Sequence, residues 1–211
     1  MSYTPAAFRE TDTAALHAMM AGAGLATLVT QSAAGPLVSH LPLLLDPAGG
    51  AMGVLTGHVA RANPQWKASD LSQPAVAIFL GPDAYVSPNY YPSKHDDPRT
   101  VPTWNYVAIH ARGRLETFDD PEQLLQLVTR LTERHERRSA NPWAVSDAPA
   151  DYLGKMLKAI VGLRLTIESI DGKKKLSQNR SEADQQGVVV GLSNSTEPGE
   201  QRIAELMRGG R

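Results

Sequence analysis

Residues 25–56 read LATLVTQSAAGPLVSHLPLLLDPAGGAMGVLT, and this stretch decides the fold class. Leu25–Thr30 and Leu37–Leu45 are short apolar-rich runs, which are typical of β-strands. The turn residues Asp46-Pro47-Ala48-Gly49-Gly50 suit a hairpin that leads into a further strand at Met52–Thr56. The stretch therefore predicts neighbouring β-strands near the N-terminal end of the chain.

The rest of the chain is predicted to contain further strands and several helices. Further strands are predicted at Pro74–Leu80, Asn105–Thr117 and Ile160–Ile170, so that about six strands suggest a barrel or a sandwich. Capping residues and apolar stripes predict five helices between the strands or after them. These helices are Thr11 or Asp12 to about Ala21, 121–138, Asp151–Ala159, Ser181–Leu192 and Glu200–Met207. We therefore expect a mainly β protein with flanking helices (α+β), as one domain over residues 1–211 with a C-terminal helical extension.

The amino-acid composition excludes several classes of function. The chain has 211 residues with 42% hydrophobic side chains and no cysteine, which excludes disulfides, thiolate catalysis and cysteine-held metal clusters. The 21 basic and 22 acidic side chains remove the strongest electrostatic argument for a nucleic-acid partner. No apolar run of about 18 residues occurs, and the first residues resemble no leader, so we expect a cytoplasmic location and no membrane association.

Sequence motifs for the commonest kinds of chemistry are missing. The six histidines form no pair with metal-ligand spacing, so no metal is predicted. Neither a nucleophile elbow nor a glycine-rich phosphate loop of the P-loop or dinucleotide-binding type is present. A catalytic triad assembled from distant positions stays open, and no catalytic residue is identified.

The segment Thr56–Trp66 is a candidate phosphate site. It reads TGHVARANPQW, closes a strand and opens a helix near Asn63-Pro64. Such a junction offers free backbone N–H groups and a positive helix end, and Arg61 supplies a guanidinium fork that matches phosphate. The alternative is an ordinary strand–helix turn that binds only water.

Two further segments place polar groups at unusual positions. Ser39-His40-Leu41-Pro42 lies within a predicted strand, where proline indicates an edge strand or a backbone turned toward a ligand. Gly172–Arg180, which reads GKKKLSQNR, follows a strand and precedes a helix. Its three lysines are typical of a solvated turn, but the Ser, Gln, Asn and Arg that follow are donors for an anionic or carbonyl-rich ligand.

A proline-rich segment separates the two halves of the chain. Seven of the 15 prolines lie between residues 64 and 102, so this region is predicted to be mostly loop and edge. The part from Tyr85 to Tyr106 also holds four tyrosines and one tryptophan, which indicates a functional loop rather than a disordered one.

The predicted helix 121–138 has a basic face, which we consider as a possible DNA-binding surface. Its arginines alternate with Glu133 and Glu136, and no second helix follows within a short turn, as a helix-turn-helix would need. We interpret the face as solvated, so direct DNA binding has no support in the sequence. The arginines are Arg130, Arg134, Arg137 and Arg138.

Together these motifs closely resemble the PaiB family, also called FMN-binding negative transcriptional regulators. The resemblance covers nearly the whole chain in the family's order. It rests on SHLP (39–42), GHVARANPQW (57–66), YYPSK (90–94) with VPTWNY (101–106), and KLSQNR (175–180). It implies an FMN-binding split β-barrel related to the pyridoxamine-phosphate-oxidase-like flavoproteins, assembled as a homodimer with FMN at the subunit interface.

The resemblance also assigns the flavin site, residue by residue. It implies that Ser39, His40 and Leu41 run along the isoalloxazine ring and that His58, Arg61, Ala62 and Asn63 bind the FMN phosphate. It further implies that Trp104, Asn105, Lys175, Ser177 and Gln178 close over the flavin, with the proline-rich segment as a lid.

Three functional hypotheses follow. The first is a flavin-binding regulator that acts on gene expression through bound FMN or a partner protein. The second is a flavin-dependent oxidoreductase that passes electrons between a reduced nicotinamide and a small acceptor, with His40 and His58 as candidate proton donors. The third is a split barrel that has lost the flavin and serves as a ligand-binding or structural module.

Overall fold

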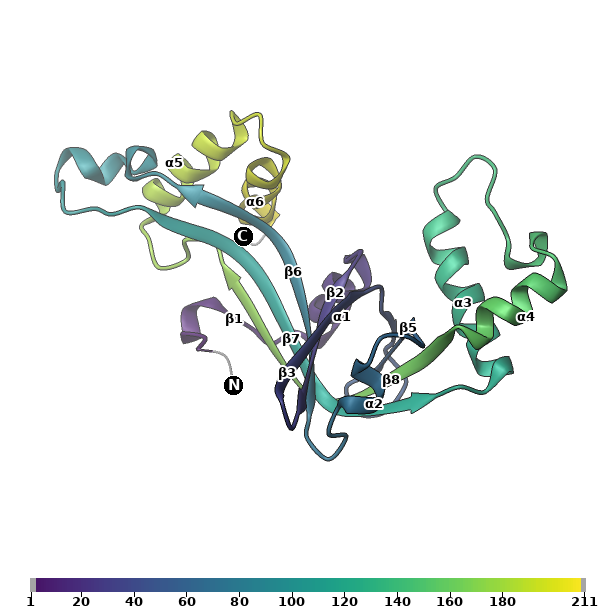
Figure 1. Cartoon of the computed structure of the whole chain (residues 1–211). Coiled ribbons are helices and arrows are strands. Elements are labelled where there is room, and N and C mark those ends of the chain that lie inside the picture. Colours follow the sequence, from purple (N-terminus) through teal and green to yellow (C-terminus); the bar gives the residue numbers. More distant parts are fainter. Residues whose placement is uncertain (1–2, 210–211) are drawn as a thin grey trace. The chain divides into compact units, whose positions relative to one another are not determined.

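The computed structural model describes residues 3–209, and its core element is one sheet of eight strands (Figure 1). The strand order is β3-β2-β6-β7-β8-β5-β4, and β1 pairs with β8. Every pairing whose register is known is antiparallel, and helices flank the strands, so the predicted mainly β fold class is confirmed. The strands are β1 (Arg9–Glu10), β2 (Ala26–Ser32), β3 (Gly35–Leu41), β4 (Leu44–Asp46), β5 (Val54–Ala60), β6 (Ala75–Val86), β7 (Thr103–Phe118) and β8 (Ile160–Lys175).

The five predicted helices are all present, and short helical turns accompany them. The α-helices are α1 (Thr13–Gly22), α2 (Gln65–Ala68), α3 (Pro121–Glu136), α4 (Ala150–Lys158), α5 (Glu182–Ser193) and α6 (Pro198–Gly209). The 3₁₀ helices are η1 (Ala6–Phe8), η2 (Pro88–Tyr90), η3 (Pro92–His95) and η4 (Val145–Asp147). No helix within residues 3–209 is long and apolar enough to cross a bilayer.

The chain forms two compact units that are interleaved in sequence. Unit 1 holds residues 1–16, 80–109 and 171–211, and unit 2 holds residues 17–79 and 110–170. The strands β6, β7 and β8 each contribute residues to both units. The prediction of a single domain stays a prediction.

Unit 2 contains a hairpin and a close crossing of two chain segments. β2 and β3 pair along their whole length, from Ala26 opposite Leu41 to Ser32 opposite Gly35. Gly57 lies in the middle of β5, where a Cβ would come within 2.8 Å of the Pro42 carbonyl oxygen. Only glycine allows this approach, which brings the end of β3 against β5.

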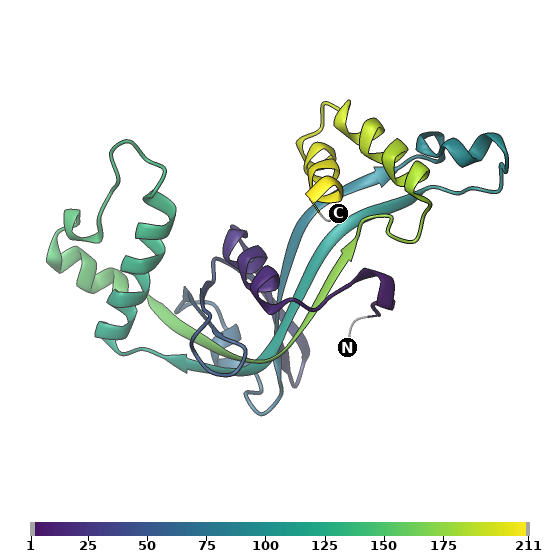
Figure 2. The same cartoon turned by 180° about the vertical axis from the view of Figure 1, so that it is seen from behind.

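Helices α3 and α4 also belong to unit 2, and they lie side by side (Figure 2). Asp120 caps α3 by accepting the backbone N–H of Gln123 at 2.9 Å, with proline at the first helical position. Leu127 and Leu131 of α3 pack with Leu44 and Phe118. The apolar stripe of α3 therefore attaches this helix to the strands of unit 2.

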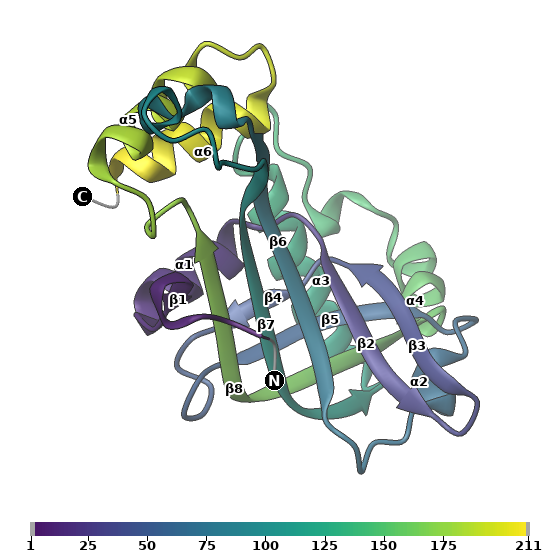
Figure 3. The same cartoon turned by 90° about the vertical axis from the view of Figure 1, so that its left-hand side faces the viewer.

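Unit 1 has its own core, built around the C-terminal helices. Helices α5 and α6 lie together with the 88–95 segment (Figure 3). Tyr90 packs on α5 at two glycines, Gly187 and Gly191, where a Cβ would overlap the carbonyl oxygen or the ring of Tyr90. Tyr91 is 2% exposed and belongs to the same core.

Three sequence predictions were wrong in detail. The run Leu37–Leu45 is two strands, because it breaks at Pro42, which has no N–H for a ladder. The strand predicted at Pro74–Leu80 continues to Val86, so that Pro82 lies within β6. Lys173–Lys175 continue β8 and pair in part with β1, so they are not a solvated turn.

The glycines of α5 give a direct test of how unit 1 is held together. Gly187→Ala is expected to lower the free energy of unfolding by about 1–3 kcal/mol, because the new methyl group must displace the Tyr90 backbone. Gly154→Ala in α4 is the matched control: its Cβ meets nothing within 4 Å, and alanine favours helix by up to about 1 kcal/mol. Urea unfolding measures both variants, and equal stability of the two would contradict the packing.

Candidate functional site

The twelve predicted site residues fall into two groups, one in each unit. Unit 2 holds seven of them, on β3, on β5 and in the junction before α2, and unit 1 holds five. The unit 2 group is Ser39, His40, Leu41, His58, Arg61, Ala62 and Asn63, and the unit 1 group is Trp104, Asn105, Lys175, Ser177 and Gln178. Each group is described within its own unit.

A buried amide organises the first group. Gln65 is 4% exposed, and its Oε1 accepts a hydrogen bond from the hydroxyl of Ser39. The Gln65 Nε2 donates to Thr30 Oγ1 at 3.0 Å, and Asn63 Nδ2 donates to Ser39 Oγ at 2.9 Å. This network fixes the end of β3 against the junction that precedes α2. The predicted site residues do not include Gln65 or Thr30. Gln65 lies in the GHVARANPQW motif, but nothing in the sequence indicates that its side chain is buried and bonded to β2 and β3.

The junction itself is a tight turn. Asn63 Oδ1 accepts the backbone N–H of Gln65 at 2.9 Å, and the Asn63 N–H donates to the Ala60 carbonyl at 2.8 Å. Helix α2 has four residues, a single turn, so the positive helix end expected from the sequence is small. A phosphate here depends on side chains and loop N–H groups rather than on a helix dipole.

Arg61 is largely engaged within the chain. Its Nε donates to the Lys158 carbonyl at 2.7 Å and its Nη2 to the Ile160 carbonyl at 3.1 Å, while Nη1 lies 3.5 Å from Asp119. A guanidinium has five N–H groups, so two remain for a ligand. The side chain is 37% exposed and therefore reachable from solvent.

His58 carries the clearest sign of a missing partner. Its ring Nδ1 is buried and makes no hydrogen bond to any residue that the structure describes. Burial lowers the pKa of His58, which favours the neutral ring. By contrast, His40 is exposed, and its Nδ1 lies 3.0 Å from Thr27 Oγ1.

The two remaining residues of the unit 2 group, Leu41 and Ala62, have no polar side chain. Leu41 is 3% exposed and packs into the core at the end of β3. Ala62 is exposed in the turn between Arg61 and Asn63. Leu41 therefore contributes mainly packing, and Ala62 leaves the turn open to solvent.

In unit 1, two distant motifs meet. Asn105 is fully buried, and its Nδ2 donates to Ser177 Oγ at 3.0 Å. Lys175 Nζ donates to the Thr103 hydroxyl. The VPTWNY and KLSQNR motifs thus form one polar cluster. Within it, the side chains of Asn105 and Ser177 are bonded mainly to each other. Trp104 lies apart from these bonds, 52% exposed and edge-on to Tyr85.

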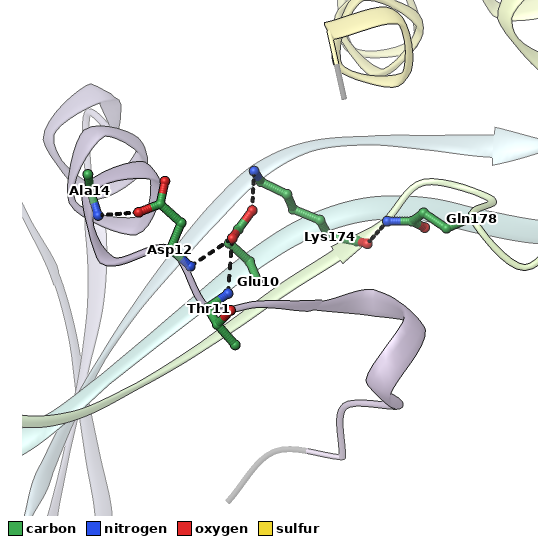
Figure 4. A network of polar contacts seen from close by, with 6 residues as sticks. All are labelled: Glu10, Thr11, Asp12, Ala14, Lys174 and Gln178. Carbon is green, nitrogen blue, oxygen red and sulfur yellow. Dashed lines mark hydrogen bonds and ion pairs between the residues drawn. The ribbon is translucent and has the colours of Figure 1, made fainter. Parts of the chain in front are cut away.

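A second network includes Lys174 at the end of β8 and Gln178 in the turn that follows (Figure 4). Gln178 Nε2 donates to the Lys174 carbonyl at 2.6 Å, and Lys174 Nζ pairs with Glu10 at 2.5 Å. The carboxylate of Glu10 also accepts the N–H groups of Thr11 and Asp12, and these contacts, led by Lys174, lower the pKa of Glu10. Gln178 therefore acts on the backbone of its own turn.

Metal ligation has no counterpart in the described structure. Within residues 3–209, no three histidine, aspartate or glutamate side chains come together as ligands for an ion.

Comparison with protein families identifies FMN as the cofactor. A family model described as "Putative FMN-binding domain" matches residues 2–169. The "Protease synthase and sporulation protein PAI 2" of Bacillus subtilis is 33% identical over 205 residues, which cover 97% of this chain and 96% of that protein. The match to the family model includes every predicted residue of unit 2 and ends before Lys175.

Solved structures give the fold. A conserved hypothetical protein from Mycobacterium tuberculosis matches with a TM-score of 0.59 at 12% identity, over 86% of this chain and 95% of that one. The FAD and heme binding protein from Mycobacterium smegmatis matches with a TM-score of 0.56 at 18% identity, over 87% and 80%. These likenesses confirm the predicted split β-barrel fold.

The Gln65 network makes a stability prediction. Gln65→Leu is expected to lower the free energy of unfolding by about 1–3 kcal/mol, since the Ser39 hydroxyl loses its buried acceptor. The control is Gln73→Leu, an exposed glutamine of the same unit, with an expected change within about 0.5 kcal/mol. Chemical unfolding measures both, and wild-type stability of Gln65→Leu would show that the network is dispensable.

Proposed function

This chain belongs to the PaiB family of FMN-binding proteins, and we propose that it holds FMN on unit 2 and regulates gene expression through the bound flavin or a partner protein. The family model supports FMN as the cofactor, and the 33% identity over nearly the whole chain supports the assignment to the family. The position of the flavin is our proposal. The contacts of the unit 2 residues support it.

The buried ring nitrogen of His58 is the observation that carries the position. A buried polar atom without a partner is costly, at about 1–3 kcal/mol, and native proteins seldom leave one unsatisfied. His58 lies on β5, immediately before the junction that the family resemblance assigns to the phosphate. A bound flavin mononucleotide offers oxygen and nitrogen atoms that would satisfy this nitrogen.

The phosphate is proposed to lie at the turn formed by Arg61, Ala62 and Asn63. Arg61 has two N–H groups to spare, and the exposed Ala62 places no bulky side chain over the turn. The Gln65 network supports this arrangement because it fixes Asn63 and Ser39 relative to each other. Ser39, His40 and Leu41 would then follow the isoalloxazine ring along β3, as the resemblance implies.

The five residues of unit 1 remain a separate prediction. The resemblance implies that Trp104, Asn105, Lys175, Ser177 and Gln178 close over the flavin, and the implied homodimer would supply them from the second subunit. Among them Trp104 has the exposed aromatic surface that contact with a flavin needs. Asn105 and Ser177 are better suited to hold the shape of their own cluster.

The second part of the proposal is that the protein regulates gene expression. The Bacillus subtilis relative bears a name that links it to protease synthesis and sporulation, which are controlled processes. With 21 basic and 22 acidic side chains, this chain favours an effect through the flavin or a protein partner over direct contact with DNA. A cytoplasmic homodimer is the form in which we expect it to act.

A flavin-dependent oxidoreductase is the alternative, and the exposed ring of His40 is the observation in its favour. An exposed imidazole beside the proposed isoalloxazine ring is suited to proton transfer, whereas the buried, neutral His58 is suited to hydrogen bonding. Oxidation of NADH or NADPH by the FMN-loaded protein would identify the enzyme. A salt-sensitive shift of promoter DNA without such turnover would identify a regulator that binds DNA directly.

The role of Arg61 can be tested by comparing FMN with riboflavin, which lacks the phosphate. Arg61→Gln is expected to reduce the preference of the protein for FMN over riboflavin about tenfold, equivalent to roughly 1.4 kcal/mol. The ratio of the two dissociation constants, from quenching of flavin fluorescence, is insensitive to a general loss of stability.

The matched control is Arg164→Gln on β8, whose guanidinium donates to Gln123 at 3.0 Å and lies over the Phe118 ring. This variant is expected to keep the wild-type ratio. An unchanged ratio in Arg61→Gln would remove Arg61 from the phosphate site.

A further inference from the structure

Unit 2 contains a basic surface cavity that the flavin proposal does not use. Its volume is about 600 Å³, and it lies between the second half of α3 and the loop that follows α1. Binding sites for small molecules have volumes of roughly 300–1,000 Å³. The twelve residues assigned to the flavin are all described by the structure, and none of them lines this cavity.

The cavity is at the opposite end of α3 from the proposed phosphate site. Arg61 contacts Asp119, just before α3 begins at Pro121. The helix has 16 residues and is therefore about 24 Å long, and Arg134 of the cavity lies in its last turn. Most of the length of α3 thus separates this cavity from Arg61.

The lining of the cavity is strongly basic. Four arginines line it, at positions i, i+4, i+7 and i+8 from α3 and the two residues that follow, which is the spacing of one helix face. Glu133 is the one carboxylate among the described lining residues, and His135 also contributes. The arginines are Arg130, Arg134, Arg137 and Arg138.

These positive charges have no carboxylate partners in the described structure. The ion pairs found within residues 3–209 include none of the four arginines. Burial lowers the pKa of Arg134, and the neighbouring charge of Arg137 lowers it further. Two close cations without an anion repel each other, and a bound anion would offset that repulsion.

Arg134 connects the two walls of the cavity. Its Nη1 donates to the Leu43 carbonyl at 3.0 Å, and its Nη2 donates to the carbonyls of Ala21 and Ala23, the latter at 2.8 Å. The loop 21–24 reads AGAG, and both of its glycines have open space where a Cβ would lie. Arg134 is therefore a positioning residue, and the three exposed arginines are available to a ligand.

We propose that this cavity binds a small organic anion that carries two or more phosphate or carboxylate groups. Guanidinium groups bind phosphate and carboxylate through paired hydrogen bonds, and several arginines in one cavity favour a ligand with more than one such group. Leu44 and Leu45 add apolar surface to the lining, which suits the carbon skeleton of an organic anion. The proposal goes beyond the flavin function, and it changes the interpretation of this helix face from solvated to ligand-binding.

Calorimetric titration of the full chain with sodium pyrophosphate, citrate and magnesium-free ATP at constant ionic strength tests the proposal. At least one of the three is expected to bind saturably, and the preferred one distinguishes phosphate from carboxylate recognition. Arg137→Gln is expected to weaken that binding about tenfold. The control Arg114→Gln on β7 removes the same charge from an exposed arginine paired with Glu116, and it is expected to leave the affinity unchanged.

Thermal unfolding of Arg137→Gln gives a second test in which two measurements separate. Without an anion, the melting temperature is expected to stay unchanged or to rise, because the repulsion with Arg134 is lost. The increase in melting temperature that the anion causes in the wild type is expected to be smaller in the variant. An arginine that is only solvated would leave that increase intact.

The ring of His135 reports which of the two proposed sites is occupied. His135 lines this cavity, whereas His58 lies on β5. In nitrogen NMR of histidine-labelled protein, the anion is expected to move the resonances of His135 and to leave those of His58 in place. FMN bound at the junction after β5 would have the reverse effect.

Four results would overturn the proposal. The first is that none of the three anions binds, and the second is that Arg130→Gln, Arg137→Gln and Arg138→Gln all leave the affinity unchanged. The third is that saturating FMN abolishes anion binding, which would make the cavity a part of the flavin site. The fourth is that a short DNA duplex binds this face more tightly than any of the three anions, which would make it a nucleic-acid surface. A chain that binds the anion but not FMN would support this proposal while the flavin proposal fails, so the two are tested separately.

Discussion

The side-chain amide of Gln65 connects the segments that carry the proposed FMN site. It accepts from Ser39 on β3 and donates to Thr30 on β2. A buried amide must keep its partners, because each one lost leaves a polar group without water or protein to bond. The β2–β3 hairpin and the turn before α2 are therefore held as one arrangement, and Asn63 is placed by its bond to Ser39.

Gly57 allows the end of β3 to approach β5, and Arg61 anchors the turn that follows β5. The absence of a side chain at Gly57 lets Pro42 approach β5, so the end of β3 and the turn that follows β5 can share one network. Arg61 ties the turn to the carbonyls of Lys158 and Ile160. At this junction the Nδ1 of His58 is buried without a hydrogen-bond partner among residues 3–209, and Arg61 has two N–H groups beyond those bonded to Lys158, Asp119 and Ile160. These unused groups are the ones proposed to meet the cofactor.

The sequence predicted the elements well where periodicity or capping residues were strong. α3 begins after Asp120 as expected, because an aspartate cap followed by proline is a clear signal. The break at Pro42 was not predicted, since the apolar run on both sides of it reads as one strand. Motif resemblance supplied Ser39 and Asn63. Gln65 lies in the same GHVARANPQW motif, but its bond to Ser39, 26 residues away in sequence, emerges only from the folded contacts.

Hydrogen bonds between side chains far apart in the sequence could not be predicted. Asn105 and Ser177 are 72 residues apart, and no local pattern predicts that they share hydrogen bonds. The two motifs could be recognised in the sequence, but the pair of buried hydrogen bonds between Asn105 and Ser177 emerges only from the folded chain. The family resemblance therefore supplied the cofactor, whereas the structure was needed to identify the hydrogen-bond partners of the residues in each motif.

The central claim is that FMN binds at the junction after β5 and satisfies the buried nitrogen of His58. Nitrogen NMR of histidine-labelled protein, recorded before and after saturation with FMN, measures this directly. The account predicts that the Nδ1 resonance of His58 moves on binding while that of the exposed His135 on α3 stays in place. Binding of FMN with an unchanged His58 resonance, or no binding of FMN at all, would contradict it.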